Sequence, residues 1–521
     1  MKLFDNIFEI DNDNYYGVVG LNKETNYIYI YNKFLNDNKN VLVLTSSLYE
    51  ASYVYQGILN YTDKVLFFPM DDFITSEAVS ISPEFKIERI NTINKLLTND
   101  KYIVVTNLMG FLRYLPNKKT WLNSIVHLSV NDKIDRDKLL ESFYNLGYEV
   151  DNLVSKTGSI ASRGYIIDIF PIGEEYPIRI ELWGNVIDSI RYFDVDTQLS
   201  TKHLKEITVM PTSEFLLDKY DENVIRKQKY LKHYANDIES LSYYMNDYIC
   251  FYYDYSQIKV SYEKIMSDIV DYNARNTNEF ETDYMFHLEE INVKNEIFLM
   301  NIDNLSNLEL KKYKVSGIVN YNEDIEVLKE SVNKYIISGK TVVIAVTNRN
   351  IFNKIRDNMD ALITNEDNIV SNKINLINKK IGNGFIIGDL VVISEFDLYK
   401  VKENNYTYKS KYKLGTKVKD INNIHNGDYI VHEIHGIGQY EGIVTLNKNG
   451  YLKDYIKLLY NKGDVLYLPV EKIDRISLYS AKEGHVPKIN TLGSGDFIKK
   501  KLALKKKFED IASKLLKIYA I

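Results

Sequence analysis

The sequence predicts a multidomain protein of the α/β plus β type. It should have two α/β domains, a β-rich insert, a small β-barrel and a long C-terminal amphipathic helix. The 521 residues are enough for roughly three to four domains of ordinary size. Near the N-terminus, buried-strand runs alternate with helical runs, which is typical of a parallel sheet covered by helices. Two later stretches contain short alternating runs and tight turns, as small all-β domains do.

Composition is that of an ordinary globular protein, with 45% hydrophobic and 26% charged residues. The net charge of -6 argues against a chain wrapped in nucleic acid along its whole length, although local basic faces are compatible with it. The single cysteine, Cys250, excludes an internal disulfide and a thiolate zinc cluster. No apolar run approaches the roughly 18 residues that span a bilayer, and no signal peptide is recognisable. We interpret the chain as cytoplasmic, with no membrane partner.

The first α/β domain is expected at 1–126 and 208–310, interrupted by the insert. Ser82, Pro83 and Glu84 combine an N-cap, a first-turn proline and an acid near the positive end of a helix dipole, so a helix should begin there. Strands are expected at NVLVLTSS (40–47), KVLFFP (64–69), KYIVVTN (101–107) and YICFYYDY (248–255).

The β-rich insert is expected at 127–207, and its run IRIELW has two distinct faces. Alternation along a strand puts Arg179 and Trp183 on one face, about 13 Å apart, and the apolar Ile178, Ile180 and Leu182 on the other. The apolar face is sufficient for a structural core. Because Arg and Trp are enriched among interface hot spots, the other face is interpreted as a partner-binding surface.

A purely structural alternative exists for the same two residues. Trp183 would pack on a neighbouring domain, and Arg179 would pair with Glu181 or Glu175. The interface interpretation is preferred.

The remaining chain should hold a small α/β domain, a linker, a barrel and a helix. The domain, at 311–400, is expected to contain the helices EDIEVLKESVNKYII and NIFNKIRDNMDAL and strands at TVVIAV, GFIIG and LVVIS. Residues 401–424 form a lysine-rich linker, and 425–485 a small barrel with turns at Asn449-Gly450 and Lys462-Gly463. The helix at 486–521 carries an apolar stripe of Leu504, Phe508, Ile511, Leu515 and Ile518. Its lysines at 499–501 and 505–507 are interpreted as a solvated face.

The stretch GVVGLNKE (17–24) resembles a degenerate phosphate-binding loop. Gly17, Gly20 and Lys23 fit that frame, but Asn22 replaces a glycine and Glu24 replaces the hydroxyl that would bind Mg²⁺. A carboxylate at this position would face the phosphates, and a side chain at 22 hinders close backbone approach. We therefore expect a helix-opening loop without a ligand, and no ATPase activity from this chain.

Other catalytic or metal sites are not predicted. Gly339-Lys340-Thr341 runs from helix to strand, the reverse of a phosphate loop. His432 and His435 have no third ligand placed by the sequence, and Cys250 lies in an aromatic run typical of a core.

Four segments together resemble the N-terminal portion of the bacterial transcription-repair coupling factors. They are FPMDDFITSEAVSISPEFKIERINTINKLL (68–97), the stretch 163–194, the barrel 427–476 with HEIHGIGQYEG, DYIKLLY and LYLPVEKID, and the segment 487–520. The resemblance covers nearly the whole chain and is weakest at 208–330.

This resemblance implies a role in transcription-coupled nucleotide excision repair, with a binding function for the insert and for the barrel. The first domain is similar to the excinuclease protein UvrB, with a decayed nucleotide site. The insert would bind the excinuclease protein UvrA through Arg163, Arg179 and Trp183, with Trp where relatives commonly have Phe. The CarD-like (Tudor-like) barrel would bind the β subunit of RNA polymerase.

On the barrel, the resemblance implicates the edge around Tyr440, Ile443 and Leu446, since an exposed strand edge can pair with a partner's strand. The alternative is that these side chains fill the barrel interior. Of the three, Tyr440 is the better core candidate and Leu446 the better contact.

The sequence departs from the family because it stops at Ile521, where an ATP-driven DNA translocase would begin. ATP, Mg and most DNA contacts would belong to that motor, so no cofactor is expected in this chain. The leading hypothesis is an adaptor between stalled RNA polymerase and the excinuclease. The alternatives are a system whose ATPase lies in missing residues or a partner polypeptide, and a stand-alone CarD-type transcription regulator.

Overall fold

The computed structural model describes most of the chain: residues 2–10, 13, 15–70, 83–154, 156–195, 197–217, 228–235, 237–275, 284–300, 308–398, 427–432, 435–448, 451–469, 476–478 and 489–492. The chain divides into two compact units, Met1–Tyr412 and Lys413–Ile521, and each is described by itself. Ser82, the 401–424 linker and nearly all of the expected C-terminal helix lie outside the described residues. No helix in the described ranges is long and apolar enough to cross a membrane.

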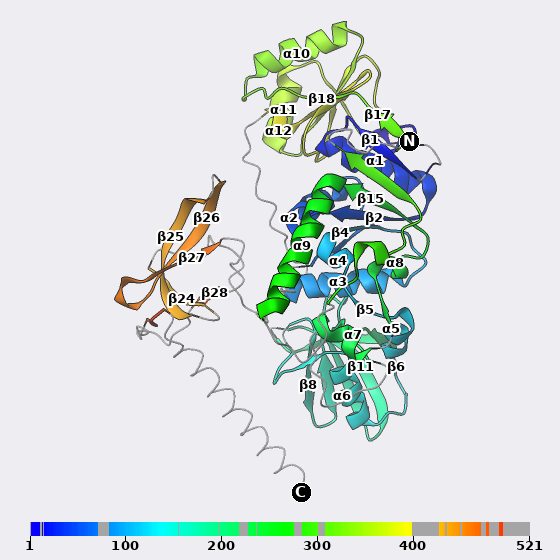
Figure 1. Ribbon diagram of the computed structural model, residues 1–521, viewed down its shortest axis with the longest axis vertical. Helices are drawn as coiled ribbons and strands as arrows, with labels where there is room; N and C mark the ends of the chain where they lie inside the picture. The colour runs from blue at the N-terminus through cyan, green and yellow to red at the C-terminus, as the bar shows by residue number, and fades with distance from the viewer. Residues whose placement is uncertain are drawn as a thin grey trace. The chain divides into compact units, whose positions relative to one another are not determined.

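A seven-stranded parallel sheet forms the centre of the first α/β domain (Figure 1). Its order is β17-β1-β16-β15-β2-β4-β3. Strands β2 and β4 are buried along their whole length, as expected for a parallel sheet with both faces covered. The strand bounds are β1 (Tyr15–Val19), β2 (Asn40–Thr45), β3 (Val65–Phe68), β4 (Ile103–Asn107), β15 (Tyr248–Tyr253), β16 (Glu296–Met300) and β17 (Leu310–Lys312). The four strands predicted from sequence for this domain are all present.

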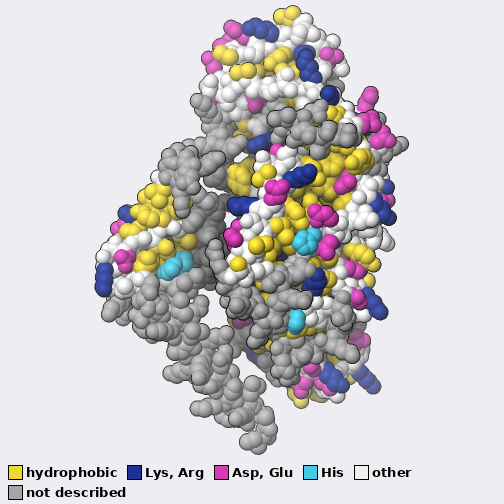
Figure 2. All heavy atoms as spheres, in the orientation of Figure 1, with side chains coloured by type: hydrophobic (Ala, Val, Ile, Leu, Met, Phe, Trp, Pro, Cys, Tyr) yellow, Lys and Arg dark blue, Asp and Glu magenta, His cyan; other side chains and the backbone are white. Residues whose placement is uncertain are grey.

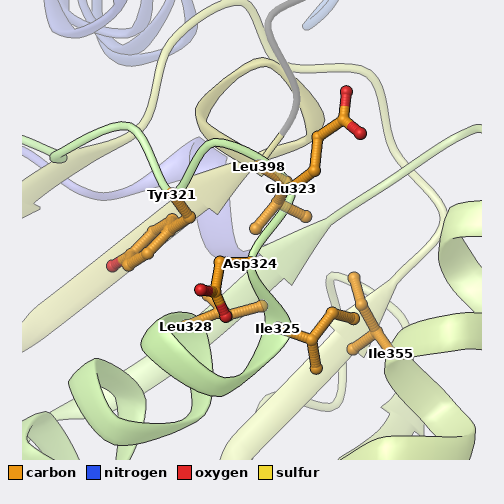
Figure 3. A pocket seen from close by; sticks show the side chains of 7 residues that line it. All are labelled: Tyr321, Glu323, Asp324, Ile325, Leu328, Ile355 and Leu398. Atoms are coloured by element: carbon orange, nitrogen blue, oxygen red, sulfur yellow. The ribbon is translucent and has the colours of Figure 1, made fainter.

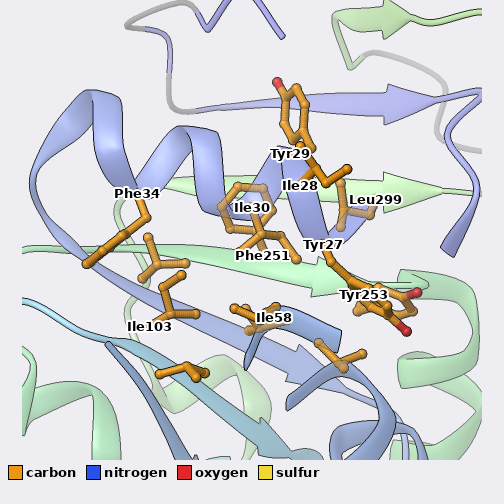
Figure 4. Packing of buried hydrophobic residues seen from close by; sticks show 14 of the residues in the cluster. Tyr27, Ile28, Tyr29, Ile30, Phe34, Ile58, Ile103, Phe251, Tyr253 and Leu299 are labelled. Atoms are coloured by element: carbon orange, nitrogen blue, oxygen red, sulfur yellow. The ribbon is translucent and has the colours of Figure 1, made fainter. Parts of the chain in front are cut away.

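Helix α1 (Lys23–Asp37) is buried on almost every side, which is unusual for a helix flanking a sheet. Figure 4 shows its side chains against Phe251, Tyr253 and Leu299 of the sheet. The same core cluster includes residues of the small α/β domain, so that domain covers the helix from the other side. The other helical elements of this domain are η1 (Leu3–Asp5), α2 (Leu48–Leu59), α3 (Pro83–Leu96), α4 (Leu108–Phe111) and α9 (Tyr255–Arg275).

The β-rich insert is a six-stranded sheet in the order β12-β11-β10-β9-β8-β7, antiparallel except between β7 and β8. Helix α6 (Arg136–Asn145), which the sequence patterns did not predict, covers one face with Leu139 and Phe143. The strands are β6 (Val126–Ser129), β7 (Glu149–Val150), β8 (Ser159–Arg163), β9 (Ile166–Ile169), β10 (Ile178–Trp183), β11 (Val186–Phe193), β12 (Ser200–Leu204) and β13 (Glu206–Val209), with β6 and β13 forming a separate pair.

A buried ion cluster lies just after the insert, where the chain returns to the first domain. Glu214 accepts hydrogen bonds from Arg89 and Arg113, each at 2.6 Å, and the three side chains are almost fully buried. Arg89 also donates to the Pro69 carbonyl. The remaining short elements of the first domain are β5 (Leu115–Pro116), α5 (Lys118–Ser124), η2 (Gln228–Tyr230), α7 (Leu231–Tyr234), β14 (Ile238–Glu239), α8 (Leu241–Tyr244) and η3 (Leu288–Glu290).

The small α/β domain is built on a sheet in the order β18-β22-β23-β19-β21-β20. Its elements are β18 (Val315–Gly317), α10 (Ile325–Ile337), β19 (Thr341–Ala345), α11 (Arg349–Asn358), β20 (Leu362–Thr364), β21 (Ile374–Ile377), β22 (Phe385–Ile387), β23 (Leu390–Ser394) and α12 (Glu395–Leu398). A shallow hollow at the start of α10 is walled mainly by Leu328, Ile355 and Leu398 (Figure 3). The N-terminal amides of α10 are already capped by Asp324, so the hollow does not offer a free anion site.

The second unit is an open antiparallel sheet rather than a closed barrel. The five strands run in the order β27-β26-β25-β24-β28, and within the described residues the two outer strands do not pair with each other. The result is a half-barrel. The elements are β24 (Tyr429–His432), β25 (Gly436–Lys448), β26 (Tyr451–Leu459), η5 (Asn461–Gly463), β27 (Val465–Pro469) and β28 (Ile476–Leu478).

Candidate partner-binding surfaces

Strand β10 has the two-faced pattern that the sequence predicts. Ile178, Ile180 and Leu182 are buried in the core beneath α6, whereas Arg179, Glu181 and Trp183 lie on the opposite face of the sheet. The β8–β9–β10 register, with Arg163 opposite Ile166 and Ile166 opposite Glu181, puts Arg163 on that same face. The three predicted binding residues therefore share one surface.

Trp183 is the most exposed part of this surface. Its side chain is 82% exposed at the end of β10, just before the turn residue Gly184, which has a φ of 60°. The alternative in which Trp183 packs on a neighbouring domain is wrong within the described structure. A large aromatic side chain held in water on a rigid hairpin is typical of an interface anchor.

Arg179 is held much more firmly than an exposed arginine. Its Nε and Nη2 donate to the two carboxylate oxygens of Asp168 at 2.7 and 2.9 Å, and Nη1 donates to the Gln198 carbonyl at 3.2 Å. The guanidinium lies 4.6 Å from the centre of the Phe193 ring. The hydrogen bonds to Asp168 raise the pKa of Arg179, and only 17% of the side chain is exposed.

The structural alternative for Arg179 is therefore correct in predicting an ion pair but wrong about the carboxylate. The arginine does pair with a carboxylate, but that carboxylate is Asp168; Glu181 pairs with Arg191 instead. Asp168, Phe193 and Gln198 were not identified from sequence. The one available signal was an acid inside the otherwise apolar strand YIIDIF.

Arg163 is exposed and donates from Nη2 to the Asn152 carbonyl at 3.1 Å. Among the described residues it has no carboxylate partner. The surface thus presents the exposed guanidinium of Arg163 and the exposed indole of Trp183. Arg179 is held between acidic and aromatic neighbours. This chemistry suits a protein partner that offers an apolar pocket beside a carboxylate.

On the half-barrel, the three predicted contact residues separate into core and surface. Tyr440 is 6% exposed and packs in the core with Leu458, so it is a core residue. Ile443 and Leu446 are 45% and 37% exposed. A register shift between Tyr440 and Ile443 marks the change from buried base to exposed hairpin.

The exposed part of β25 also has an open edge. Strand β24 pairs only with residues 436–439, and the described pairs of 443–448 are all with β26. Hydrophobic side chains gather on this unit in the space-filling view (Figure 2), and its exposed apolar residues include Ile443, Leu446 and Tyr467. An open edge with apolar side chains can accept a strand from a partner.

The loop that resembles a phosphate-binding site is too short to enclose a phosphate, and a helix amide beside it already has a hydrogen-bond acceptor. Only residues 20–22 separate β1 from α1, because Gly17 lies inside the strand. The Asn22 side chain accepts the Thr25 N–H at 2.9 Å, which caps the helix amides that would otherwise face a phosphate. Lys23 is exposed, whereas Glu24 is buried, and burial raises the pKa of Glu24.

Other sequence motifs have structural explanations. Gly339 follows α10 and precedes β19, the helix-to-strand order that excludes a phosphate loop. Cys250 is buried in β15, and burial raises the pKa of its thiol. His432 Nδ1 accepts the His435 N–H at 3.2 Å, and within the described residues no group of three potential ligands could hold a metal ion.

Comparisons with known proteins give a family match for each of the two domains described above. Residues 126–215 match the UvrB interaction domain family, and residues 424–480 match the CarD-like/TRCF RID domain family. The chain is 28% identical to the transcription-repair-coupling factor of Staphylococcus aureus (strain bovine RF122 / ET3-1), and 27% identical to those of Staphylococcus haemolyticus (strain JCSC1435) and Staphylococcus epidermidis (strain ATCC 35984 / DSM 28319 / BCRC 17069 / CCUG 31568 / BM 3577 / RP62A). Each comparison covers 96% of this chain and 48% of the relative, so the chain spans about half the length of these proteins. The resemblance predicted from sequence is confirmed.

Proposed function

We propose that this chain is an adaptor in transcription-coupled nucleotide excision repair, linking RNA polymerase stalled at a DNA lesion to the excinuclease. The insert would bind UvrA, and the half-barrel would bind the β subunit of RNA polymerase. The observation that carries the proposal is the presence of a UvrB interaction domain and a CarD-like/TRCF RID domain in one chain. The proposed site of action is the cytoplasm.

The insert surface supports the first half of the proposal. The exposed Trp183 offers an aromatic anchor, and the exposed Arg163 offers a charge that can orient a partner. Arg179 is already oriented and so loses little entropy on binding. The half-barrel supports the second half through the open edge of β25 at Ile443 and Leu446. The buried Tyr440 is withdrawn from this contact set and assigned to the core.

A bridging assay tests the whole proposal. RNA polymerase immobilised on beads should retain UvrA only when the purified chain is added. The double variant Arg163→Glu/Trp183→Ala should stay on the polymerase but fail to retain UvrA. If the wild-type chain binds polymerase yet never UvrA, the stand-alone CarD-type regulator is the better description.

We also propose that the described residues hydrolyse no ATP. The short loop at residues 20–22 and the capping role of Asn22 support this, because both remove the amide cradle that a phosphate needs. Steady nucleotide turnover by the purified chain would overturn this point and favour an enzymatic function. Turnover that requires a second polypeptide would instead indicate a motor supplied in trans.

A further inference from the structure

The edge of the first sheet where a nucleotide would bind is covered by the chain itself. Strand β17 pairs in parallel with β1, with Gly17 opposite Leu310, and the Tyr313 N–H then donates to the Val19 carbonyl at 2.9 Å. A Cβ on Gly20, where φ is 86°, would collide with the Tyr313 carbonyl oxygen. Backbone therefore occupies the space beside the loop, and Gly20 is required by that close approach.

The side chain of Tyr313 fixes this crossing segment in place. Its ring contacts the rings of Phe8 and Tyr29 edge-on, with centroid distances of 5.1 and 5.7 Å. The Tyr29 hydroxyl is in turn hydrogen-bonded to that of Tyr16 on β1 at 2.8 Å. The covering strand is thus part of the aromatic core rather than a loose flap.

Glu24 joins the start of α1 to the small α/β domain. Its carboxylate accepts hydrogen bonds from the Tyr61 hydroxyl and from the Asn383 N–H, the latter at 3.2 Å. A Cβ on Gly382 would lie only 2.5 Å from Glu24 Oε2. The next amide, Gly384 N–H, is bound by Asp397 at 2.9 Å, so consecutive amides of this turn each donate to a buried carboxylate.

A second set of contacts strengthens the same interface. The Leu3 N–H donates to the Glu366 carbonyl at 2.8 Å, and the Glu366 carboxylate pairs with Lys379 at 2.8 Å. The Lys379 ammonium also lies over the rings of Phe4 and Tyr61. Apolar residues of both domains share one buried core, including Val343, Ala345, Ile377, Ile381, Phe385 and Val392 of the small domain.

We infer that the small α/β domain is the permanent occupant of the strand–loop–helix at residues 15–25, with Glu24 as the anion that its 382–384 turn binds. The segment around Tyr313 and this turn belong to the same chain and occupy the space that a bound nucleotide would take. The two domains then form one rigid body, and nucleotide is excluded by occupancy as well as by sequence. This inference does not depend on which partners the chain binds.

Hydrogen exchange on the 521-residue chain tests the inference from both sides of the contact. Gly382→Ala should push the Glu24 carboxylate away and speed exchange of the Asn383 amide about tenfold, the effect expected for losing a hydrogen bond to a charged group. Gly317→Ala is the matched control, because a Cβ there meets nothing within 4 Å. Glu24→Ala should behave like Gly382→Ala, and Lys23→Ala, at the exposed neighbouring position, should have no effect.

Nucleotide binding gives the second readout. A fluorescent ATP analogue should show no saturable binding to the wild-type chain or to Asn22→Gly/Glu24→Ser, in which phosphate-loop residues are restored. The inference is overturned if the wild-type chain binds the analogue and Lys23→Ala weakens that binding. It is equally overturned if Gly382→Ala, Glu24→Gln and Glu24→Ala all fold normally and the Asn383 amide exchanges at the wild-type rate in each of them.

Discussion

Asp168 and Arg179 face each other directly across β9 and β10 and form a two-pronged ion pair, with N–O distances of 2.7 and 2.9 Å. Asp168 is almost fully buried, and the Phe193 ring packs against the guanidinium. The pair therefore orients Arg179 before any partner arrives, which reduces the entropy lost on binding.

Removing the charge of Asp168 should weaken partner binding without unfolding the insert. Asp168→Asn keeps the shape and one acceptor, so we expect a loss of stability of about 1 kcal/mol and roughly tenfold weaker binding of UvrA. Calorimetric titration and thermal unfolding measure the two effects separately. Asp188→Asn, an exposed carboxylate on β11, is the control and should change neither. Wild-type affinity for Asp168→Asn would show that the pair is purely structural.

Trp183→Ala should have a large effect on partner binding and almost none on folding. Because the indole is 82% exposed, its removal should change the free energy of unfolding by less than about 0.5 kcal/mol. Loss of a central aromatic anchor should weaken UvrA binding at least about thirtyfold. Surface plasmon resonance measures this. Tyr243→Ala, another exposed aromatic residue in α8, should bind normally; an equal loss there would point to a non-specific effect.

The sequence predicted which face of a sheet a side chain lies on better than it predicted which residues of the adjacent strands lie beside it. Period-two alternation shows that Arg179 and Trp183 share a face, but the cross-strand register that places Asp168 opposite Arg179 is set by the intervening turn. The same limit applies to Tyr440, which lies in the core opposite Leu458 of the neighbouring strand. Glu24 was recognisable as a replacement for the hydroxyl of a phosphate loop, but its Asn383 partner is 359 residues away in the chain. Contacts of this kind have no local signal.

Two substitutions on β25 should distinguish a residue that stabilises the core from a residue that contacts RNA polymerase. Leu446→Arg changes an exposed side chain, so we expect normal stability and RNA polymerase binding weakened at least about tenfold, as for a charge placed in an apolar contact. Tyr440→Ala empties a core position and should lower the free energy of unfolding of this unit by about 3 kcal/mol. Pull-down and urea titration distinguish them. Leu362→Arg, an exposed leucine on β20, is the control. Unchanged polymerase binding by Leu446→Arg would remove this edge from the interface.

Stability in acid should depend on Glu214 at the joint between insert and first domain. Burial alone raises the pKa of Glu214, but the charges of Arg113 and Arg89 outweigh it and hold the pKa at about 2. A carboxylate whose pKa is lowered on folding contributes stability above its unfolded value, which is about 4.3 for Glu. That contribution falls as pH drops from about 4.3 towards 2, by on the order of 3 kcal/mol in all.

Urea unfolding between about pH 6 and pH 2.5 measures this contribution across the range in which Glu214 should titrate. Glu214→Gln should be less stable than wild type at the upper end, because two buried arginines lose their counter-charge, and the difference should shrink steadily as the pH falls. Glu141→Gln, an exposed position on α6, should follow the wild-type curve throughout. A constant difference between Glu214→Gln and wild type across this range would mean that the pKa of Glu214 is the same in the folded and unfolded protein, and the two arginines would not stabilise its charge.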